Sequence, residues 1–385
     1  MKNFSFANPV KIIFGKDTIK EVANEIPKGS KVLVTYGGGS IKKNGVFDQV
    51  SNALAGYEWY EFAGIEPNPH YETCMKAASL IKEKDVDFVL AVGGGSVIDA
   101  TKFIVAAACF EEGDPWLIME KKAAIKKALP FGSILTLAAT ASEMNSGGVI
   151  TRAATQEKLA FGSPLVFPKF SVLDPTVTYT LPDKQTGNGI VDTFVHVAEQ
   201  YLTYSKEDTL LQDYMAEAIL KTLVVEGPKV FKDPKNYDVR ANLMWASTWG
   251  LNGWIAKGAD EDWATHMIGH EITAFYGVDH GQTLAIVLPG VMEVMREQKA
   301  KKIIRMGREV FGINEKSDDV AIDKTIKAVE NFFESVGIKT HLSDYGLGEE
   351  AIQKIGKRLN DRGWRLGECQ NITGDVAMKI LETRK

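Results

Sequence analysis

Residues 87–103 read DFVLAVGGGSVIDATKF, and this stretch decides the fold. An apolar run at 87–92 ends at three glycines, and apolar residues at helical spacing follow. Apolar runs rich in β-branched residues recur before residue 180, separated by amphipathic stretches, at 10–14, 31–36, 133–137 and 170–174. Strands that alternate with helices predict a mainly parallel sheet covered on both faces.

The pattern changes after Pro182, where long segments with a period of 3.6 residues begin. The clearest of these segments cover 186–202, 210–227 and 323–337. We therefore predict an α/β domain over 1–182 and an all-α domain over 183–385, packed around a cleft of the kind in which ligand sites form. No repeat or low-complexity linker interrupts this organisation.

Composition favours small-molecule chemistry. The 385 residues are 45% hydrophobic and 25% charged, and the net charge of -5 provides no cationic field for nucleic acid or an anionic membrane. Three cysteines without CxxC spacing predict neither a disulfide framework nor a thiolate zinc site, so we expect a cytoplasmic protein. The phenylalanine-rich N-terminus is interpreted as the start of a strand, not as a signal peptide, and every apolar run is shorter than the about 18 residues of a membrane span.

Glycines at the end of the run 87–92 indicate a phosphate site. Backbone amides of Gly94, Gly95 and Ser96 would approach a diphosphate closely, with the following helix N-terminus adding partial positive charge. The stretch matches neither GxGxxG nor the P-loop. An alternative is that Ser96 and Asp99 form only a helix-capping pair.

A second glycine turn, in KVLVTYGGGSIKK at 31–43, bears on cofactor choice. Acidic residues that grip the adenosine ribose diol are absent from 36–43. Gly38, Ser40 and the lysines after Ser40 instead favour NADP(H) over NAD(H). The alternative is a tight turn with solvated lysines.

The stretch LTLAATASEMNSGG at 135–148 follows a third strand and contains Thr136, Thr140 and Asn145. Such side chains beside a strand end can hydrogen-bond ribose or nicotinamide, although they are also ordinary loop and cap residues. Lys158 is interpreted either as a ribose contact or as a solvated charge.

A second group of residues has the spacing of metal ligands. Asp192 and His196 stand four apart, as do His266 and His270, and His280 follows ten residues later. Residues four apart share one helix face, so each pair can reach one ion, and imidazole with carboxylate suits Fe²⁺ or Zn²⁺. One of the five candidates is spare and is a candidate proton donor. Against this stands the usual role of a single histidine as a hydrogen-bonded core or surface residue.

The chain resembles the iron-containing alcohol dehydrogenase family along nearly its whole length, and most closely its butanol dehydrogenase and NADPH-dependent aldehyde reductase branch. The segments that carry the resemblance are GGGSVIDATKF, EPNPHYET, LTLAATASE, LDPTVTYTLP, GNGIVDTFVHVAEQY, DWATHMIGHEITAFYGVDHGQTLAIVLP and THLSDYGL. The resemblance implies a Rossmann-like α/β domain followed by an all-α domain, the dehydroquinate synthase-like architecture, and a homodimer.

The resemblance also implies roles for individual residues. The implied metal ligands are Asp192, His196, His266 and His280, and His270 would line the substrate pocket. The implied cofactor contacts are Gly94, Gly95 and Ser96 at the diphosphate, Asp99, Thr136, Thr140, Asn145 and Lys158 along ribose and nicotinamide, and Gly38 and Ser40 at the 2′-phosphate. The sequence departs from many relatives in reading LAATASE where they have proline or glycine before the threonine, which puts the Thr140 contact in doubt.

These observations predict reversible reduction of a short- or medium-chain aldehyde, such as butanal, to a primary alcohol by NADPH and one divalent metal ion, Fe²⁺ or Zn²⁺. His270, water or the ribose hydroxyls would supply the proton, and nearby aromatic residues form either an apolar pocket wall or core. Three rivals remain: a sugar-phosphate cyclase or lyase, a nonredox metallohydrolase and a non-catalytic nucleotide-binding protein. The first needs lysines and arginines around the metal, and the segments DTFVHVAEQ and THMIGHEITAF contain none.

Overall fold

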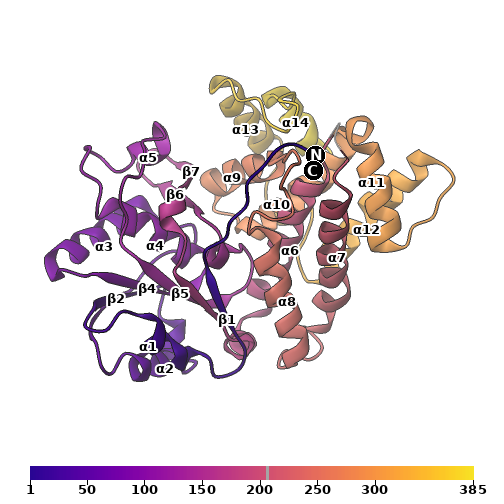
Figure 1. Ribbon diagram of the computed structural model, residues 1–385. Helices are drawn as coiled ribbons and strands as arrows, with labels where there is room; N and C mark the ends of the chain where they lie inside the picture. The colour runs from indigo at the N-terminus through magenta and orange to yellow at the C-terminus, as the bar shows by residue number, and fades with distance from the viewer. Residues whose placement is uncertain (205–207) are drawn as a thin grey trace. The chain divides into compact units, whose positions relative to one another are not determined.

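The computed structural model describes residues 1–204 and 208–385, which form two compact units. One unit is Ala7–Leu181, and the other is Met1–Phe6 together with Pro182–Lys385 (Figure 1). The first six residues join the helical unit because Lys2 N donates to Gly258 O at 2.9 Å and the Phe6 ring lies 5.1 Å from that of Trp254. The strand predicted at 10–14 is present as β1, which begins at Lys11, but residues 1–6 are not part of a strand.

The α/β unit is built on a six-stranded sheet in which all the neighbouring strands pair in parallel. The strands in sheet order are β1 (Lys11–Phe14), β8 (Phe170–Leu173), β5 (Phe131–Leu137), β4 (Phe88–Gly94), β2 (Lys31–Tyr36) and β3 (Glu58–Phe62). The predicted parallel sheet is confirmed. The chain also forms β3, which the apolar pattern did not reveal.

Helices cover the sheet because its strands are apolar on both faces. Val32 and Val34 of β2 share a buried cluster with Val46 of α2, whereas Thr35 faces the other side and its Oγ1 lies 2.7 Å from Oγ1 of Thr101 on α4. The helices of this unit are α1 (Val22–Glu25), α2 (Val46–Ala53), α3 (Tyr71–Lys84), α4 (Gly95–Ala107) and α5 (Leu117–Glu120).

A separate antiparallel ribbon follows the sheet strand β5. It consists of β6 (Gly147–Arg152) and β7 (Glu157–Gly162), neither of which was predicted. Thr151 of β6 donates its N–H to Pro69 O at 2.8 Å, so the ribbon is joined to the loop that precedes α3.

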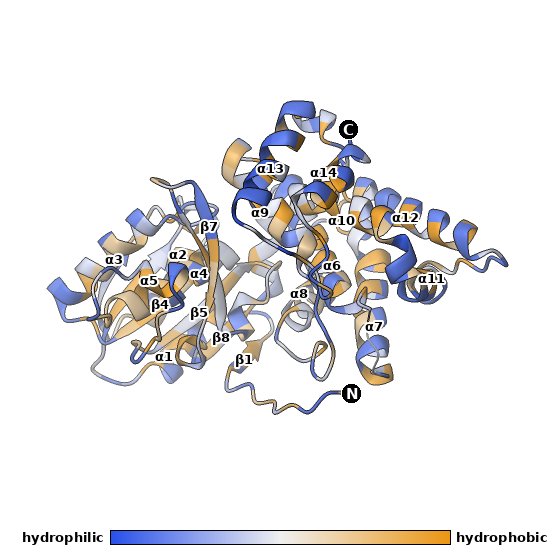
Figure 2. Cartoon of the chain, turned by 90° about the horizontal axis from the view of Figure 1, so that it is seen from above, coloured by the Kyte–Doolittle hydropathy of each residue, from blue (hydrophilic) through white to orange (hydrophobic). Residues whose placement is uncertain are grey.

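Nine α-helices make up the second unit in its described residues: α6 (Asp183–Tyr201), α7 (Leu210–Glu226), α8 (Tyr237–Gly250), α9 (Ala264–Tyr276), α10 (His280–Val294), α11 (Arg296–Phe311), α12 (Asp318–Ser335), α13 (Glu349–Asp361) and α14 (Gly374–Glu382). Hydrophobic and hydrophilic residues alternate around α12 in Figure 2. Its apolar side packs on α6, where the Phe194 ring lies 5.2 Å from that of Phe332. The predicted all-α half is confirmed. No helix in the described ranges is long and apolar enough to cross a membrane.

Candidate metal centre and nucleotide site

Three helices of the second unit bring the predicted metal ligands together. Asp192 and His196 lie one turn apart on α6, His266 lies on α9, and His280 is the first residue of α10. The start of α10 approaches α6 closely, because a Cβ atom at Gly281 would lie only 2.6 Å from Asn188 O. Glycine at this position therefore allows His280 to reach the ligands on α6.

The imidazoles converge on one carboxylate oxygen. Asp192 Oδ1 lies 3.3 Å from His196 Nδ1, 3.8 Å from His266 Nε2 and 3.7 Å from His280 Nε2. Possible ligand atoms of Asp192, His196 and His266 all lie within 4.8 Å of one another, and these three residues are buried. His280 is at the edge of the cluster, with a side chain that is 23% exposed.

The cluster fits a divalent metal ion. Within the described residues, Asp192 Oδ1 and His266 Nε2 are buried and have no hydrogen-bond partner, and such atoms are costly to bury unless something else binds them. A mixed imidazole and carboxylate set is suited to Fe²⁺ or Zn²⁺ and poorly suited to Mg²⁺ or Ca²⁺.

Glu199, which was not predicted from the sequence, orients His266, one of the candidate ligands. Its Oε2 contacts Nδ1 of His266, and its Oε1 accepts the N–H groups of Thr265 at 2.6 Å and of His266 at 3.3 Å. A carboxylate at Nδ1 fixes the tautomer of the ring and leaves Nε2 for the metal. The available signal was that Glu199 follows Asp192 by seven residues, on the same helix face.

Charge around His266 favours its protonated form in the metal-free protein. Burial disfavours the imidazolium, but Glu199 and Asp192 outweigh burial and raise the pKa of His266 to about 9. A metal ion that binds Nε2 therefore has to displace a proton at neutral pH.

His270 lies beside the cluster, one helical turn after His266. Its ring centroid is 5.2 Å from that of His280 and 6.1 Å from that of His266. The Trp263 ring is 5.3 Å from His266, whereas Phe275 packs against a core cluster and under the Arg358 guanidinium. Trp263 thus lies at the histidine cluster, whereas Phe275 belongs to the core.

The predicted nucleotide residues gather at one edge of the parallel sheet. The carboxyl ends of β2, β4 and β5 are adjacent, since Tyr36 pairs with Val92 and Gly94 with Leu137. The predicted residues in and just after these strands are Gly38, Ser40, Gly94, Gly95, Ser96, Thr136 and Thr140. Ligands of open parallel sheets bind outside this edge.

The turn between β4 and α4 leaves no room for side chains. A Cβ atom at Gly93 would lie 2.5 Å from Val97 Cγ2, and one at Gly95 would lie 2.4 Å from Thr140 Oγ1. The interpretation of Ser96 as a capping residue is wrong, because Gly94 is the N-cap of α4 and no side chain caps the helix. The amides at the start of α4 are thus placed as a phosphate cradle requires.

Asp99 and Asn145 are engaged by the protein itself. Asp99 Oδ1 accepts from Ser142 Oγ at 2.6 Å and Oδ2 accepts from Val149 N at 2.9 Å. Asn145 Oδ1 accepts from Lys102 Nζ at 2.7 Å. Lys102 was not predicted as a site residue, although a lysine in the apolar stretch DATKFIVAA is an unusual feature of the sequence.

Lys158 and Lys42 lie in environments that the sequence did not predict. Lys158 is buried and donates to Asn68 Oδ1 at 2.8 Å, so its interpretation as a solvated charge is wrong. Lys42 donates to Glu61 Oε2 at 2.7 Å, and Glu61 also accepts from Tyr36 Oη at 2.6 Å. An acidic residue from β3 therefore lies near the second glycine turn, where Lys42 compensates its charge.

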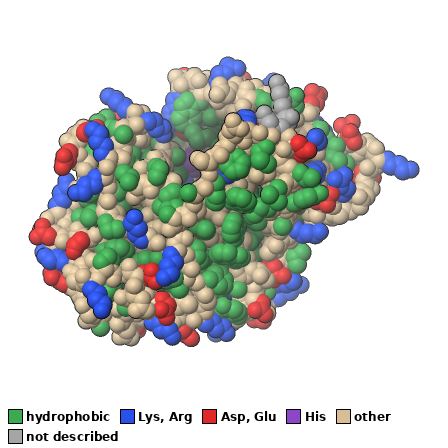
Figure 3. Space-filling model, in the orientation of Figure 1, with side chains coloured by type: hydrophobic (Ala, Val, Ile, Leu, Met, Phe, Trp, Pro, Cys, Tyr) green, Lys and Arg blue, Asp and Glu red, His purple; other side chains and the backbone are tan. Residues whose placement is uncertain are grey.

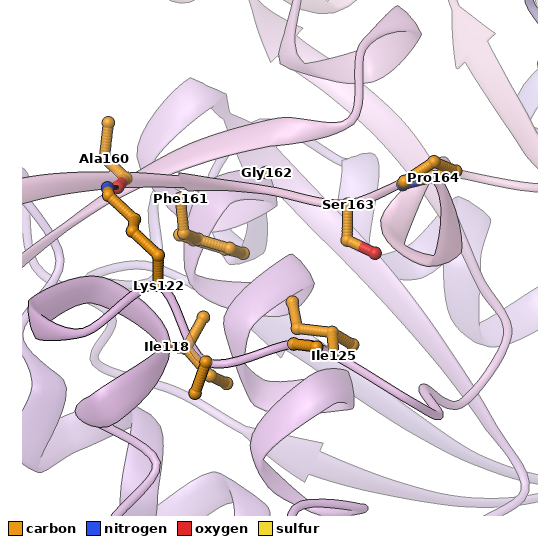
Figure 4. Close-up of a pocket in the computed structure, with 10 residues that line it drawn as sticks. Ile118, Lys122, Ile125, Ala160, Phe161, Gly162, Ser163 and Pro164 are labelled. Carbon is orange, nitrogen blue, oxygen red and sulfur yellow. Dashed lines mark hydrogen bonds between the residues drawn. The ribbon is translucent and has the colours of Figure 1, made fainter.

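A pocket of about 480 Å³ lies elsewhere in the α/β unit (Figure 4). Ile118, Ile125 and Phe161 line it together with Lys122, whose Nζ donates to Ala160 O at 2.9 Å. None of the predicted site residues lines this pocket.

Comparison with known proteins gives matches along the whole chain. The family model described as iron-containing alcohol dehydrogenase matches residues 9–175, and the model of the C-terminal part of the Fe-containing alcohol dehydrogenase family matches 186–383. The NADPH-dependent aldehyde reductase YqhD of Escherichia coli is 53% identical over 100% of both chains. NADH-dependent butanol dehydrogenase B of Clostridium acetobutylicum is 40% identical over 99% of both.

Solved structures of similar proteins have the same fold. The substrate- and cofactor-free form of the aldehyde reductase YqhD from Escherichia coli matches with a TM-score of 0.93 and 51% identity over 100% of both chains. NADH-dependent butanol dehydrogenase A from Thermotoga maritima matches with a TM-score of 0.95 and 38% identity, over 100% of this chain and 99% of that one.

Proposed function

This chain belongs to the iron-containing alcohol dehydrogenase family, and on that premise we propose that it is a metal-dependent alcohol dehydrogenase that works as an NADPH-dependent aldehyde reductase. The substrates are short- to medium-chain aldehydes and the corresponding primary alcohols, such as butanal and butanol. The observation that carries the proposal is the convergence of three imidazoles on Asp192 Oδ1 in a chain related over its full length to such enzymes.

We assign the metal ligands as Asp192, His196, His266 and His280. The unpartnered Asp192 Oδ1 and the Nε2 atom that Glu199 leaves available on His266 support this assignment. When bound, Fe²⁺ or Zn²⁺ supplies Lewis-acid chemistry at the substrate oxygen, and NADPH supplies the hydride. His270, whose ring lies 5.2 Å from that of His280, is assigned as the residue that donates the proton needed to complete the product alcohol.

We assign the nucleotide to the sheet edge formed by β2, β4 and β5. Gly94, Gly95 and Ser96 at the start of α4 hold the diphosphate, and Gly38 and Ser40 hold the 2′-phosphate. Thr136, Thr140 and Lys158 lie along the ribose and nicotinamide, with Asp99 and Asn145 supporting the loop beside them. The NADPH-dependent relative at 53% identity supports NADP(H), while the NADH-dependent relatives at 39–42% leave NAD(H) as the second candidate.

The proposal includes a cytoplasmic homodimer. Free cysteines at 74, 109 and 369 are typical of a reducing compartment. Hydrophobic side chains gather on the face of the molecule seen in Figure 3. The N-terminal segment and α7 contribute exposed hydrophobic residues, since Phe4 is 47% exposed, Leu211 56% and Tyr214 55%. Such a patch is typical of a protein interface.

The decisive experiment is an assay of purified protein with NADPH and butanal, with the metal removed by a chelator and then restored as Fe²⁺ or Zn²⁺. We expect loss of NADPH absorbance that depends on metal and aldehyde together. Absence of oxidation in every metal state would refute the dehydrogenase and leave a metallohydrolase or a non-catalytic nucleotide-binding protein. A substrate preference for sugar phosphates over butanal would favour the cyclase or lyase.

A further inference from the structure

Lys102 is a buried cation that the proposed function does not use. It lies on α4 and is 0% exposed. Its Nζ donates to Ser142 Oγ at 2.8 Å, to Asn145 Oδ1 at 2.7 Å and to Gly147 O at 2.6 Å. An ammonium group has three N–H donors, so all of them are committed to one loop.

Asp99, one helical turn before Lys102, binds the same loop from the same helix. Its carboxylate accepts from Ser142 Oγ and Val149 N, at 2.6 Å and 2.9 Å. The hydroxyl of Ser142 therefore donates to the carboxylate and accepts from the ammonium. Two charged residues of α4 thus fix the segment from Ser142 to Val149, which leads into β6, and each compensates the charge of the other in a buried setting.

The loop in turn fixes Thr140 against the phosphate cradle. Asn145 Nδ2 donates to Thr140 O at 3.3 Å, and Ser142 N donates to Thr140 Oγ1 at 3.2 Å. The Thr140 side chain fills the space where Gly95 has no Cβ, since a Cβ there would lie 2.4 Å from Thr140 Oγ1. A chain of direct contacts therefore leads from Lys102 through Ser142 and Asn145 to the glycine turn.

We propose that Lys102 is a positioning residue for the nucleotide, which holds the loop 140–149 so that Thr140 and the turn at Gly93–Gly95 form a preorganised site for the NADPH diphosphate. The proposal rests on the proposed function. Lys102 does not touch the nucleotide, because its three donors are already bound within the protein. A preorganised site avoids the free-energy cost of ordering a loop when the nucleotide binds. Lys102 therefore increases the affinity of the protein for NADPH.

A purely stabilising role for Lys102 makes a different prediction. Replacing a buried ion pair by apolar atoms of similar volume is often neutral for stability, whereas removing one partner leaves the other charge uncompensated. A stability change alone is therefore uninformative, and the useful readouts are NADPH affinity and the local order of the loop.

The experiment compares the wild type with Lys102→Met in the metal-loaded protein. NADPH binding without aldehyde is titrated by fluorescence, kcat and the KM for NADPH are measured with butanal, and amide hydrogen exchange reports on 140–150. We expect Kd and KM for NADPH to rise about tenfold or more, kcat at saturating NADPH to change less than about threefold, and exchange to accelerate in this loop. Lys299→Met is the matched control, because Lys299 is a buried lysine of the helical unit that binds Asp262 and Glu368.

Each possible result of this experiment supports or overturns the positioning role of Lys102. An NADPH Kd for Lys102→Met within about twofold of the wild type, or an equal rise for Lys299→Met, overturns the proposal. Should Lys102→Met not fold, Ser142→Ala removes one acceptor while retaining the lysine, and an unchanged NADPH Kd for it also overturns the proposal. Failure of the wild type to bind NADPH at all refutes the proposed function instead.

Discussion

Glu199 and His266 form a buried carboxylate–imidazole pair, with Oε2 of Glu199 at Nδ1 of His266. The same carboxylate accepts two backbone N–H groups at the start of α9. This relationship positions both the ring and the helix that carries it, so that Nε2 of His266 lies 3.8 Å from Asp192 Oδ1. Glu199 would therefore act on a bound metal ion through His266.

The first prediction concerns Glu199→Gln. The amide lacks the charge that stabilises the ring orientation, so we expect metal affinity to fall by about 10–100-fold. The measurement is metal retained at equilibrium with a chelator of known affinity. Glu217→Gln is the matched control, because Glu217 is also a buried glutamate of this unit but binds Tyr201 and Arg305. Equal metal affinity in the wild type and Glu199→Gln would contradict the positioning role.

The second prediction distinguishes the proposed role of His270 as proton donor from the proposed role of His280 as metal ligand. His280→Ala removes a proposed ligand and is expected to lower metal content and turnover together. His270→Ala is expected to keep its metal and to lower turnover about 10²–10⁴-fold, the usual contribution of a general acid. Metal analysis and kcat on the same samples provide the comparison. Parallel loss of metal and turnover in His270→Ala would show that His270 is a ligand.

Much of the fold was predictable because buried parallel strands have a simple signal. The apolar run KVLVTY predicted 31–36, and β2 covers Lys31–Tyr36. Other elements lack that signal: β3 reads EWYEF, with charged residues at both Glu58 and Glu61, and β7 reads EKLAFG. β3 is stabilised by parallel pairing with β2, and β7 by antiparallel pairing with the adjacent β6, and an apolar pattern within either strand does not reveal this pairing.

The candidate site likewise has some contacts that a local sequence pattern predicts and others that it does not. Helical spacing predicted that Asp192 and His196 share a face, and the structure places Asp192 Oδ1 3.3 Å from His196 Nδ1. The partners of Glu199 and Lys102 lie on other elements, 67 residues away for His266 and 40 for Ser142. No spacing rule connects residues so far apart, so these positioning contacts required the structure.

The third prediction concerns cofactor preference and Gly38→Asp. Gly38 has no atom within 4 Å of an added Cβ and no positive φ, so a side chain fits there without strain. An aspartate would repel the 2′-phosphate and would bind the ribose diol of NADH. We expect kcat/KM for NADPH to fall about tenfold or more, with kcat/KM for NADH unchanged or higher.

Gly38→Ala is the control for that experiment, since it adds the Cβ without the charge. Similar losses with NADPH in both variants would indicate a steric effect and would remove Gly38 from the 2′-phosphate site. Gly39 is unsuitable for such a test, because its φ of +90° disfavours any side chain.

The fourth prediction concerns the pH dependence of stability and Lys102. Burial lowers the pKa of Lys102 to about 8, and Asp99 and Glu143 offset only part of this effect. Between that value and the ordinary lysine pKa of about 10.4, the unfolded chain binds a proton that the folded protein has released, so Lys102 makes stability rise with pH. The contribution is up to about 3 kcal/mol across this window.

The measurement is denaturant unfolding of the wild type and Lys102→Met at pH 7.5 to 10, at constant ionic strength. Other groups titrate in both proteins, so the difference in free energy of unfolding between the two isolates Lys102. We expect the wild type to gain stability relative to Lys102→Met as pH rises. A constant difference across the range would show that Lys102 keeps an ordinary pKa in the folded protein, with the effect of burial fully offset by its neighbours.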